Sequence, residues 1–230
     1  MIDLYYWPTP NGWKISIMLE ECGLAYNTIP VNIGAGDQFQ PEFLAISPNN
    51  RMPAIVDHDP PGGGEPVSAF ETGAILLYLA EKTGKFMPAD LRGRMKVIEW
   101  LMWQMGGLGP MLGQNGHFKL YAPEKIPYAV DRYDREAKRL FGVLDKQLAT
   151  TGDCIAGEYS IADMACFPWV ITHKRQEIPI EDYPHVAAWL EKLRIRPALD
   201  KGMRLHEDWR TNASVDDKKA REILFGIKAT

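Results

Sequence analysis

Two polar side chains, Thr9 and Asn11, stand where the segment "YYWPTPNGWK" changes from a strand pattern to a helical one. A loop at the start of a helix presents free N–H groups and the positive end of the helix dipole, and both favour an anion such as a thiolate. Redox proteins often place a cysteine there, because this position lowers the cysteine pKa. No cysteine is present in this loop, so the sulfur must come from a small thiol. Thr9 and Asn11 can each donate one hydrogen bond to that sulfur.

The loop by itself leaves a second role open. Thr and Asn are also residues that cap helices, so Thr9 and Asn11 could simply stabilise the helix that follows. Tyr5 and Tyr6 compete for the role of sulfur ligand, but both lie inside the predicted strand. Because side chains alternate along a strand, one of these tyrosines must point into the core.

Two residue pairs further along the chain could bind a peptide-like molecule. Met52-Pro53 precedes a predicted strand, and Glu71-Thr72 opens a predicted helix. A cis bond before Pro53 would present the N–H and C=O of Met52 to a ligand backbone, whereas a trans proline is allowed at the start of an edge strand. Thr72 and the helix N–H groups suit a carboxylate, and Glu71 suits an ammonium. The same residue types also suit a plain helix cap.

Two differently patterned halves must position these residues. Strand patterns cover 2–6, 26–31, 54–57 and 66–70, and helical spacing covers 12–23, which Gly23 would cap, and 72–82. This order, β-α-β then β-β-α, is typical of a thioredoxin-like domain. Later residues show helical spacing over 92–116, 127–149, 161–176 and 184–196, and "SIAD", 160–163, predicts a capping box.

The predicted fold is therefore an α/β domain followed by an all-α domain. We expect a thioredoxin-like domain over 1–85, a linker over 86–91, a helical bundle over 92–210 and a charged tail over 211–230. The tail should pack loosely and end in a short helix.

Composition and charge exclude several classes. The 230 residues are 46% hydrophobic and 24% charged, with a net charge of −4, so there is no basic footprint for nucleic acid or for a membrane surface. The N-terminus lacks the pattern of a signal peptide, and no apolar run approaches a membrane span. Cys22, Cys154 and Cys166 show neither C-x-x-C nor metal-ligand spacing, which predicts reduced thiols, no bound metal and a cytoplasmic protein.

Three motifs together resemble those of the glutathione transferase superfamily over nearly the whole chain: "NRMPAIVD", "FETGAILLYL" and "SIADMACFPW". More narrowly, "TPNGWK", "GDQFQPEFLAISPNNRMPAIVDH", "GAILLYLAEKTG" and "WQMGGLGPMLGQ" resemble the bacterial nu-class and the yeast prion-related branch. Those relatives reduce disulfides with glutathione and conjugate electrophiles poorly. The resemblance implies a cis Met52-Pro53 bond and a glutathione-dependent disulfide reductase that uses the thiolate of glutathione.

The resemblance also implies further contacts to glutathione. Gln38 is the preferred ligand for the glycyl carboxylate, with Asn50 or Arg51 as alternatives. Arg132 stands where the nu-like branch has an arginine that approaches glutathione carboxylates. The residue pattern alone would instead pair Arg132 with Glu136 at i+4 on a solvated helix face.

The resemblance implies a homodimer that takes glutathione and a small disulfide. Two other functions stay open: conjugation of glutathione to electrophiles or reduction of organic peroxides, and a non-catalytic binding or scaffold module. Trp100, Trp103 and Gln104 belong either to the core or to an apolar wall for the second substrate.

Overall fold

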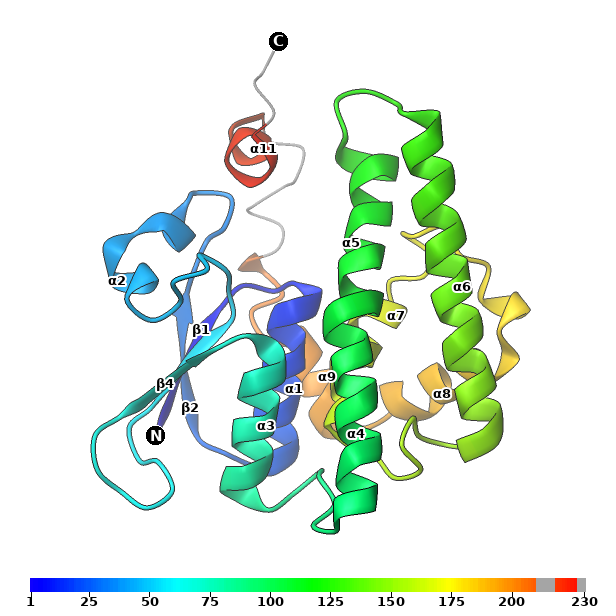
Figure 1. The fold of residues 1–230 in the computed structure, drawn as a ribbon. Helices are drawn as coiled ribbons and strands as arrows, with labels where there is room; N and C mark the ends of the chain where they lie inside the picture. The colour runs from blue at the N-terminus through cyan, green and yellow to red at the C-terminus, as the bar shows by residue number, and fades with distance from the viewer. Residues whose placement is uncertain (210–217, 227–230) are drawn as a thin grey trace. The chain divides into compact units, whose positions relative to one another are not determined.

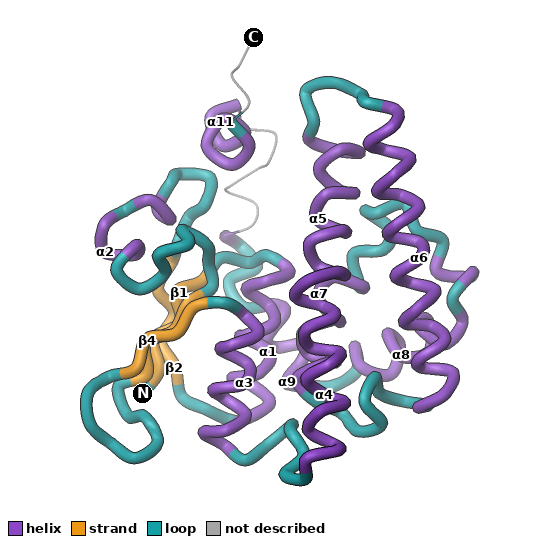
Figure 2. The backbone as a smooth tube through the Cα atoms, in the orientation of Figure 1, coloured by secondary structure: helices purple, strands orange, loops and turns teal. Residues whose placement is uncertain are grey.

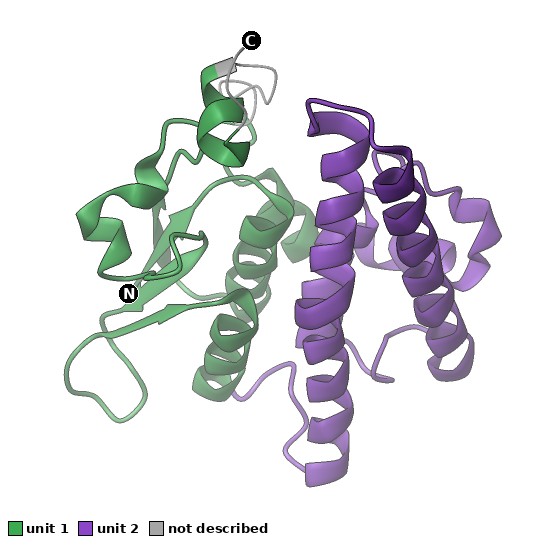
Figure 3. Cartoon of the chain, turned by 45° about the horizontal axis from the view of Figure 1, so that its top comes forward, with its two compact units in different colours: residues 1–83, 197–230 green, residues 84–196 purple. Residues whose placement is uncertain are grey.

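The computed structural model describes residues 1–209 and 218–226, which fall into two compact units (Figure 3). The first unit holds residues 1–83 and the described part of 197–230, and the second holds residues 84–196. The sequence predicts that the helical bundle extends to residue 210, whereas the described residues from Pro197 onward belong to the first unit. The expected short helix of the tail is α11 (Lys218–Phe225); the rest of the tail, 211–217 and 227–230, lies outside the described residues.

The first unit is built on a four-stranded mixed sheet, drawn in orange in Figure 2. Its strands are β1 (Ile2–Tyr6), β2 (Tyr26–Pro30), β3 (Ala54–Asp57) and β4 (Val67–Phe70). They lie in the order β2-β1-β3-β4, with β1 parallel to β2, β1 antiparallel to β3 and β3 antiparallel to β4. The thioredoxin-like prediction is thus confirmed, although β4 begins one residue later than expected.

Helices α1 (Pro10–Cys22) and α3 (Thr72–Thr83) lie side by side against this sheet (Figure 1). The connection between β2 and β3 contains η1 (Asp37–Phe39) and α2 (Pro41–Leu44). α1 starts two residues earlier than predicted, because proline fits the first helical position. It ends as predicted at Gly23, which has a left-handed φ of 69°.

α9 (Pro197–Arg204), a helix that the sequence pattern did not predict, covers a further face of α1. The Ser16 hydroxyl donates a hydrogen bond of 2.7 Å to the carbonyl oxygen of Gly202. A Cβ atom on Gly202 would lie 2.7 Å from the Cα of Ile17, so only glycine permits this approach. This close backbone contact explains why α9 belongs to the first unit.

The second unit is all-helical, as predicted. It contains α4 (Leu91–Trp103), η2 (Gln104–Leu108), α5 (Gly109–Gly116), η3 (His117–Tyr121), α6 (Pro127–Thr151), α7 (Ile161–Val170), η4 (Ile180–Asp182) and α8 (Pro184–Arg194). The helix predicted over 92–116 is interrupted by the π-helical turn η2, which contains the Gly106-Gly107 pair. None of the described helices combines the length and apolarity that crossing a bilayer requires.

The capping box predicted at the start of α7 is confirmed, with Ser160 and Asp163 as its two members. The predicted end of this helix at residue 176 is wrong, because α7 stops at Val170. Beyond it the chain forms turns, in which the Thr172 hydroxyl donates to the carbonyl oxygen of Trp169.

Candidate functional site

The register of the sheet brings three predicted segments together at one end of its strands. Ala54 pairs with Tyr5 on one side and with Phe70 on the other. The loop after β1, the Met52-Pro53 pair before β3 and the Glu71-Thr72 pair after β4 therefore emerge beside one another. Residues as far apart in the sequence as Thr9 and Thr72 thus lie at the N-terminal ends of α1 and α3.

Thr9 closes the N-terminus of α1. Its Oγ accepts a hydrogen bond of 3.2 Å from the Gly12 N–H, so the capping role that the sequence left open is present. Asn11, partly exposed, is the second residue of the helix, whose first turn holds no acidic side chain. Of the two competing tyrosines, Tyr6 points into the core, and its hydroxyl donates to the carbonyl oxygen of Leu205 at 3.3 Å.

The Thr9 hydroxyl also joins the loop to the cis-proline segment. The Met52–Pro53 peptide bond is cis, as predicted. Thr9 Oγ lies 3.6 Å from the Met52 sulfur and donates to it while its oxygen caps the helix. Capping and donation to a sulfur are therefore compatible roles of one hydroxyl. A thioether is a weak acceptor, so a thiolate at the same distance would compete for this hydrogen bond effectively.

A buried lysine of α1 and a strained acid lie at the start of α3. The Lys14 amine donates to the Thr72 hydroxyl oxygen at 3.2 Å, and both residues are buried. Glu71 is exposed and has a φ of 68°, a left-handed conformation that costs a non-glycine residue about 1–2 kcal/mol. Its carboxylate accepts from the Asn49 amide at 3.3 Å. Such strain clusters at ligand-binding positions, which is consistent with the predicted role of Glu71.

Lys14 is not among the site residues that the sequence predicts. A lysine beside a predicted apolar helix face is ordinarily solvated, and the sequence of α1 holds no signal that this one is buried. Its burial follows from the packing of α3 against α1, which only the folded chain reveals.

Gln38 is buried in η1, with 2% of its surface exposed. Its Nε2 donates to the Ile33 carbonyl oxygen at 3.2 Å, and its Oε1 has no hydrogen-bond partner among the described residues. A ligand N–H would satisfy that oxygen, whereas a carboxylate would need the second hydrogen of Nε2. Of the two alternatives, Arg51 is exposed and donates to the Asn50 side chain at 3.3 Å.

Arg132 lies in the second unit, exposed on α6. A hollow of about 380 Å³ there is lined by Met111, Arg132, Tyr133, Arg135, Glu136 and Arg139. The local partner expected for Arg132 is engaged elsewhere, since the Glu136 carboxylate pairs with Arg139 at 2.8 Å. This hydrogen bond, with a smaller contribution from the charge of Arg132, holds the pKa of Glu136 below its ordinary value.

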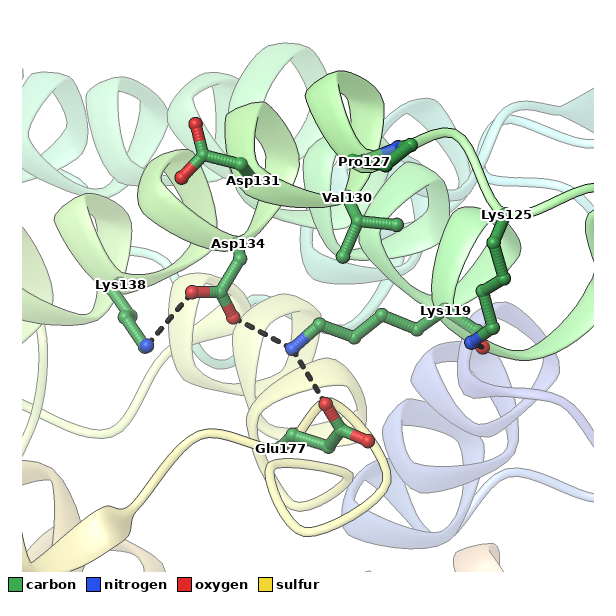
Figure 4. A pocket seen from close by; sticks show the side chains of 8 residues that line it. All are labelled: Lys119, Lys125, Pro127, Val130, Asp131, Asp134, Lys138 and Glu177. Carbon is green, nitrogen blue, oxygen red and sulfur yellow. Dashed lines mark hydrogen bonds and ion pairs between the residues drawn. The ribbon is translucent and has the colours of Figure 1, made fainter.

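A larger hollow of about 520 Å³ in the same unit contains none of the predicted site residues. Figure 4 shows the Lys119 side chain between Asp134 and Glu177. Its Nζ lies 2.7 Å from a carboxylate oxygen of Asp134 and 3.1 Å from one of Glu177. The other carboxylate oxygen of Asp134 pairs with Lys138 at 2.8 Å. Burial alone would raise the pKa of Asp134, but the two lysines outweigh it and lower that pKa. These compensated charges tie η3, α6 and the segment after α7 together.

The three cysteines are all buried and form no disulfide. Cys22 and Cys166 lie on helices α1 and α7, as expected for packing residues. Burial raises the pKa of the Cys154 thiol to about 12, so this thiol stays protonated at neutral pH. No group of three or more His, Cys, Asp or Glu side chains in the described part of the chain is arranged to hold a metal ion.

Two models of known protein families match the chain. Residues 1–81 match the N-terminal domain of glutathione S-transferases, and residues 110–197 match their C-terminal domain. The chain belongs to the glutathione S-transferase family. Within that family it is 56% identical over 203 residues to the disulfide-bond oxidoreductase YfcG of Escherichia coli K12, covering 88% of this chain and 94% of the relative.

Two solved transferase structures are similar as well. One, from Pseudomonas putida with one glutathione disulfide bound per subunit, is 45% identical with a TM-score of 0.85, covering 89% of this chain and 91% of the other. The second, from Pseudomonas fluorescens Pf-5 with two glutathione molecules bound, is 46% identical with a TM-score of 0.82, covering 88% and 92%.

Proposed function

We propose that this transferase is a glutathione-dependent disulfide-bond oxidoreductase whose sulfur nucleophile belongs to glutathione. The observation that carries this function is the loop before α1. It places a hydroxyl donor, Thr9, at the positive end of a helix and 3.6 Å from the sulfur beside the cis-proline, with no protein cysteine in the loop. The relative named for this activity and the structure holding glutathione disulfide support the proposal.

Glutathione supplies the nucleophile and the electrons: two of its thiols become one glutathione disulfide while one substrate disulfide becomes two thiols. The chain binds and orients that sulfur. Thr9 and Asn11 donate hydrogen bonds to it, and the field of α1 favours its anionic form. The same donors stabilise the negative charge that develops on sulfur during exchange.

The remaining site residues hold the peptide portion of glutathione. The N–H and C=O of Met52, presented by the cis bond to Pro53, suit the cysteinyl backbone. Thr72 and the N-terminus of α3 suit the γ-glutamyl carboxylate, and Glu71 suits the neighbouring ammonium. Gln38 fits the glycyl end, where the orphaned Oε1 atom suits an N–H donor.

Arg132 supplies a further positive charge for a glutathione carboxylate. Its guanidinium lines the smaller hollow of α6, beside Arg135 and Arg139. Replacing Arg132 by Gln should raise the KM for glutathione with little change in kcat, because uniform binding is lost.

The decisive assay compares two second substrates, each supplied together with glutathione. We expect rapid reduction of 2-hydroxyethyl disulfide and slow conjugation of 1-chloro-2,4-dinitrobenzene. The reverse ranking would favour the alternative function, conjugation or peroxide reduction. A protein that shows neither activity, is not retained on immobilised glutathione and is not stabilised by it against heat would be the scaffold module instead.

We further propose that the protein is a homodimer that acts in the cytoplasm. Leu91, Met95 and Met102 share one face of α4 at i, i+4 and i+11 and are 74%, 44% and 47% exposed. A second copy would cover this apolar face. Sedimentation at micromolar concentration checks the proposal: a fully active monomer would refute it.

A further inference from the structure

Lys14 lies in the second turn of α1, and its amine reaches the start of α3. The residue is 2% exposed, and its Nζ is 3.2 Å from the Oγ of Thr72, which is 7% exposed. Lysine is rarely buried to this extent, because removing an ammonium from water is unfavourable unless nearby groups compensate.

The direction of the hydrogen bond follows from the two groups. An ammonium has three donors and no acceptor, so the Thr72 oxygen must accept from Lys14. The hydroxyl hydrogen of Thr72 therefore points away from Lys14. The first turn of α3 adds its own N–H groups and contains no acidic residue.

Charges of opposite sign thus flank Thr72. Lys14 provides the cation, and Glu71, the residue immediately before Thr72, provides the anion from its left-handed backbone conformation. The γ-glutamyl end of glutathione carries a carboxylate and an ammonium on one carbon atom. A hydroxyl donor backed by a cation, with an acid one residue away, complements such a zwitterion.

We propose that Lys14 is a positioning residue that orients the Thr72 hydroxyl as a donor and supplies the charge that attracts the α-carboxylate of the γ-glutamyl group. This inference rests on the proposed function, since it assumes that glutathione binds at the start of α3. The site then selects thiols that carry a free α-amino acid carboxylate, and it discriminates against thiols in which that carboxylate is neutral.

The test compares two ligands and matched variants by calorimetric titration. The ligands are glutathione and its analogue amidated at the γ-glutamyl α-carboxylate. Lys14→Met removes the amine while keeping the length of the side chain, and Lys201→Met removes an exposed lysine of the same unit that pairs with Glu20. Lys14→Met should raise the Kd for glutathione about ten- to a hundredfold, the range for losing a charged hydrogen bond. Its Kd for the amide should stay within about twofold of the parent, and Lys201→Met should change neither value.

Steady-state kinetics separate positioning from a general loss of structure. The KM for glutathione should rise in Lys14→Met, whereas the KM for 2-hydroxyethyl disulfide should not. If Lys14→Met does not fold, Lys14→Gln carries the same test, because it keeps a donor near Thr72 and removes the charge. An unchanged Kd for glutathione, or an equal loss for both ligands, overturns the role of Lys14. A parent protein that binds neither ligand and reduces no disulfide overturns the proposed function itself.

Discussion

The N-termini of α1 and α7 use related caps in different surroundings. At the start of α7 the Ser160 hydroxyl caps the helix, and the buried Asp163 carboxylate accepts hydrogen bonds from the N–H of Ile155, the N–H and hydroxyl of Ser160 and the Trp189 indole at 2.9–3.3 Å. At the start of α1 Thr9 also caps the helix, but the first turn contains no acidic side chain.

The difference shows what turns a helix start into a binding position. In α7 the protein supplies its own anion, and that anion is also a structural link to α8 through Trp189. Burial raises the pKa of Asp163 to about 6, whereas the hydrogen bonds that its oxygens accept favour the ionised carboxylate. In α1 the field of the helix is not balanced by an acid of its own first turn, which suits an anion brought by a ligand.

We expect a change at the start of α1 to damage activity while sparing the fold. Asn11→Ala should lower the kcat for reduction of 2-hydroxyethyl disulfide about ten- to a thousandfold, because a donor to developing negative charge is lost. The melting temperature should change little, since Asn11 is only partly buried. Asn27→Ala, which removes an exposed asparagine bonded to Asp3, is the matched control. Turnover close to the parent value would remove Asn11 from the mechanism and direct attention to Thr9 and Tyr6.

A change at the start of α7 should have the opposite profile. Asp163→Ala leaves the buried Trp189 indole and the Ile155 N–H without their acceptor, which should cost about 3 kcal/mol of unfolding free energy. The kcat of the folded fraction should stay within about twofold of the parent, because all the hydrogen bonds of Asp163 go to residues of the helical unit. Urea unfolding and activity, each measured well below the melting temperature, separate the two effects. Loss of turnover without loss of stability would contradict the comparison.

Much of this contrast is visible in the sequence. The capping box follows from Ser160 and Asp163 at their spacing, and the absence of a cysteine between Thr9 and Asn11 already points to a sulfur from outside. The four strands also follow from local patterns, because each element agrees with its own residue preferences. The family resemblance, and not the spacing of residues, predicts the cis bond before Pro53.

What the sequence does not reveal depends on contacts between distant segments. The burial of Lys14 requires α3, and the cover that α9 gives to α1 requires the glycine at position 202 to meet the backbone of Ile17. The predicted helical bundle over 92–210 includes position 209, yet Trp209 stacks on Trp7 of the first unit with ring centroids 5.6 Å apart. The spacing of apolar residues within a single helix carries no information about these long-range contacts.

Asp57, at the end of β3, is a buried aspartate of the first unit. Its pKa shift is opposite in direction to that of Asp163 in the second unit. Burial alone would raise the pKa of Asp57, but hydrogen bonds from Lys82 and Tyr78 of α3 outweigh it and hold that pKa below 3.8. The ionised carboxylate therefore favours the folded state above pH 3.8. This contribution is lost as the pH falls through the lowered pKa, because the unfolded chain binds the proton first.

Urea titrations between pH 7 and pH 3 test this sign. Asp57→Asn should be less stable than the parent at pH 7, and the gap between the two should narrow as the pH falls below about 4. The control Asp59→Asn changes a neighbouring acid whose backbone N–H donates to Asp57. A gap that widens in acid would show that the carboxylate does not stabilise the folded state in its ionised form.

The smallest expected effect concerns the protein's own sulfur atoms. If the start of α1 activates the thiolate of glutathione, no cysteine of the chain takes part. The variant Cys22→Ala, Cys154→Ser, Cys166→Ala should then keep its reductase turnover within a few-fold of the parent. Some stability should be lost, because each buried sulfur that is removed leaves a small cavity costing about 1 kcal/mol. Activity is therefore compared well below the melting temperature, with folding checked separately.

The competing mechanism uses a protein thiolate and predicts a different outcome. One of the three single cysteine variants would lose nearly all turnover, and the parent would form a mixed disulfide with glutathione, seen as an increase in mass. Cys154, the cysteine in a loop, is poorly suited to that role because burial raises its pKa to about 12, so very little thiolate exists at neutral pH. If the cysteine-free variant is fully active, the reacting thiolate must belong to glutathione. Thr9 and Asn11 would then bind it at the start of α1, whose first turn, unlike that of α7, contains no acidic residue.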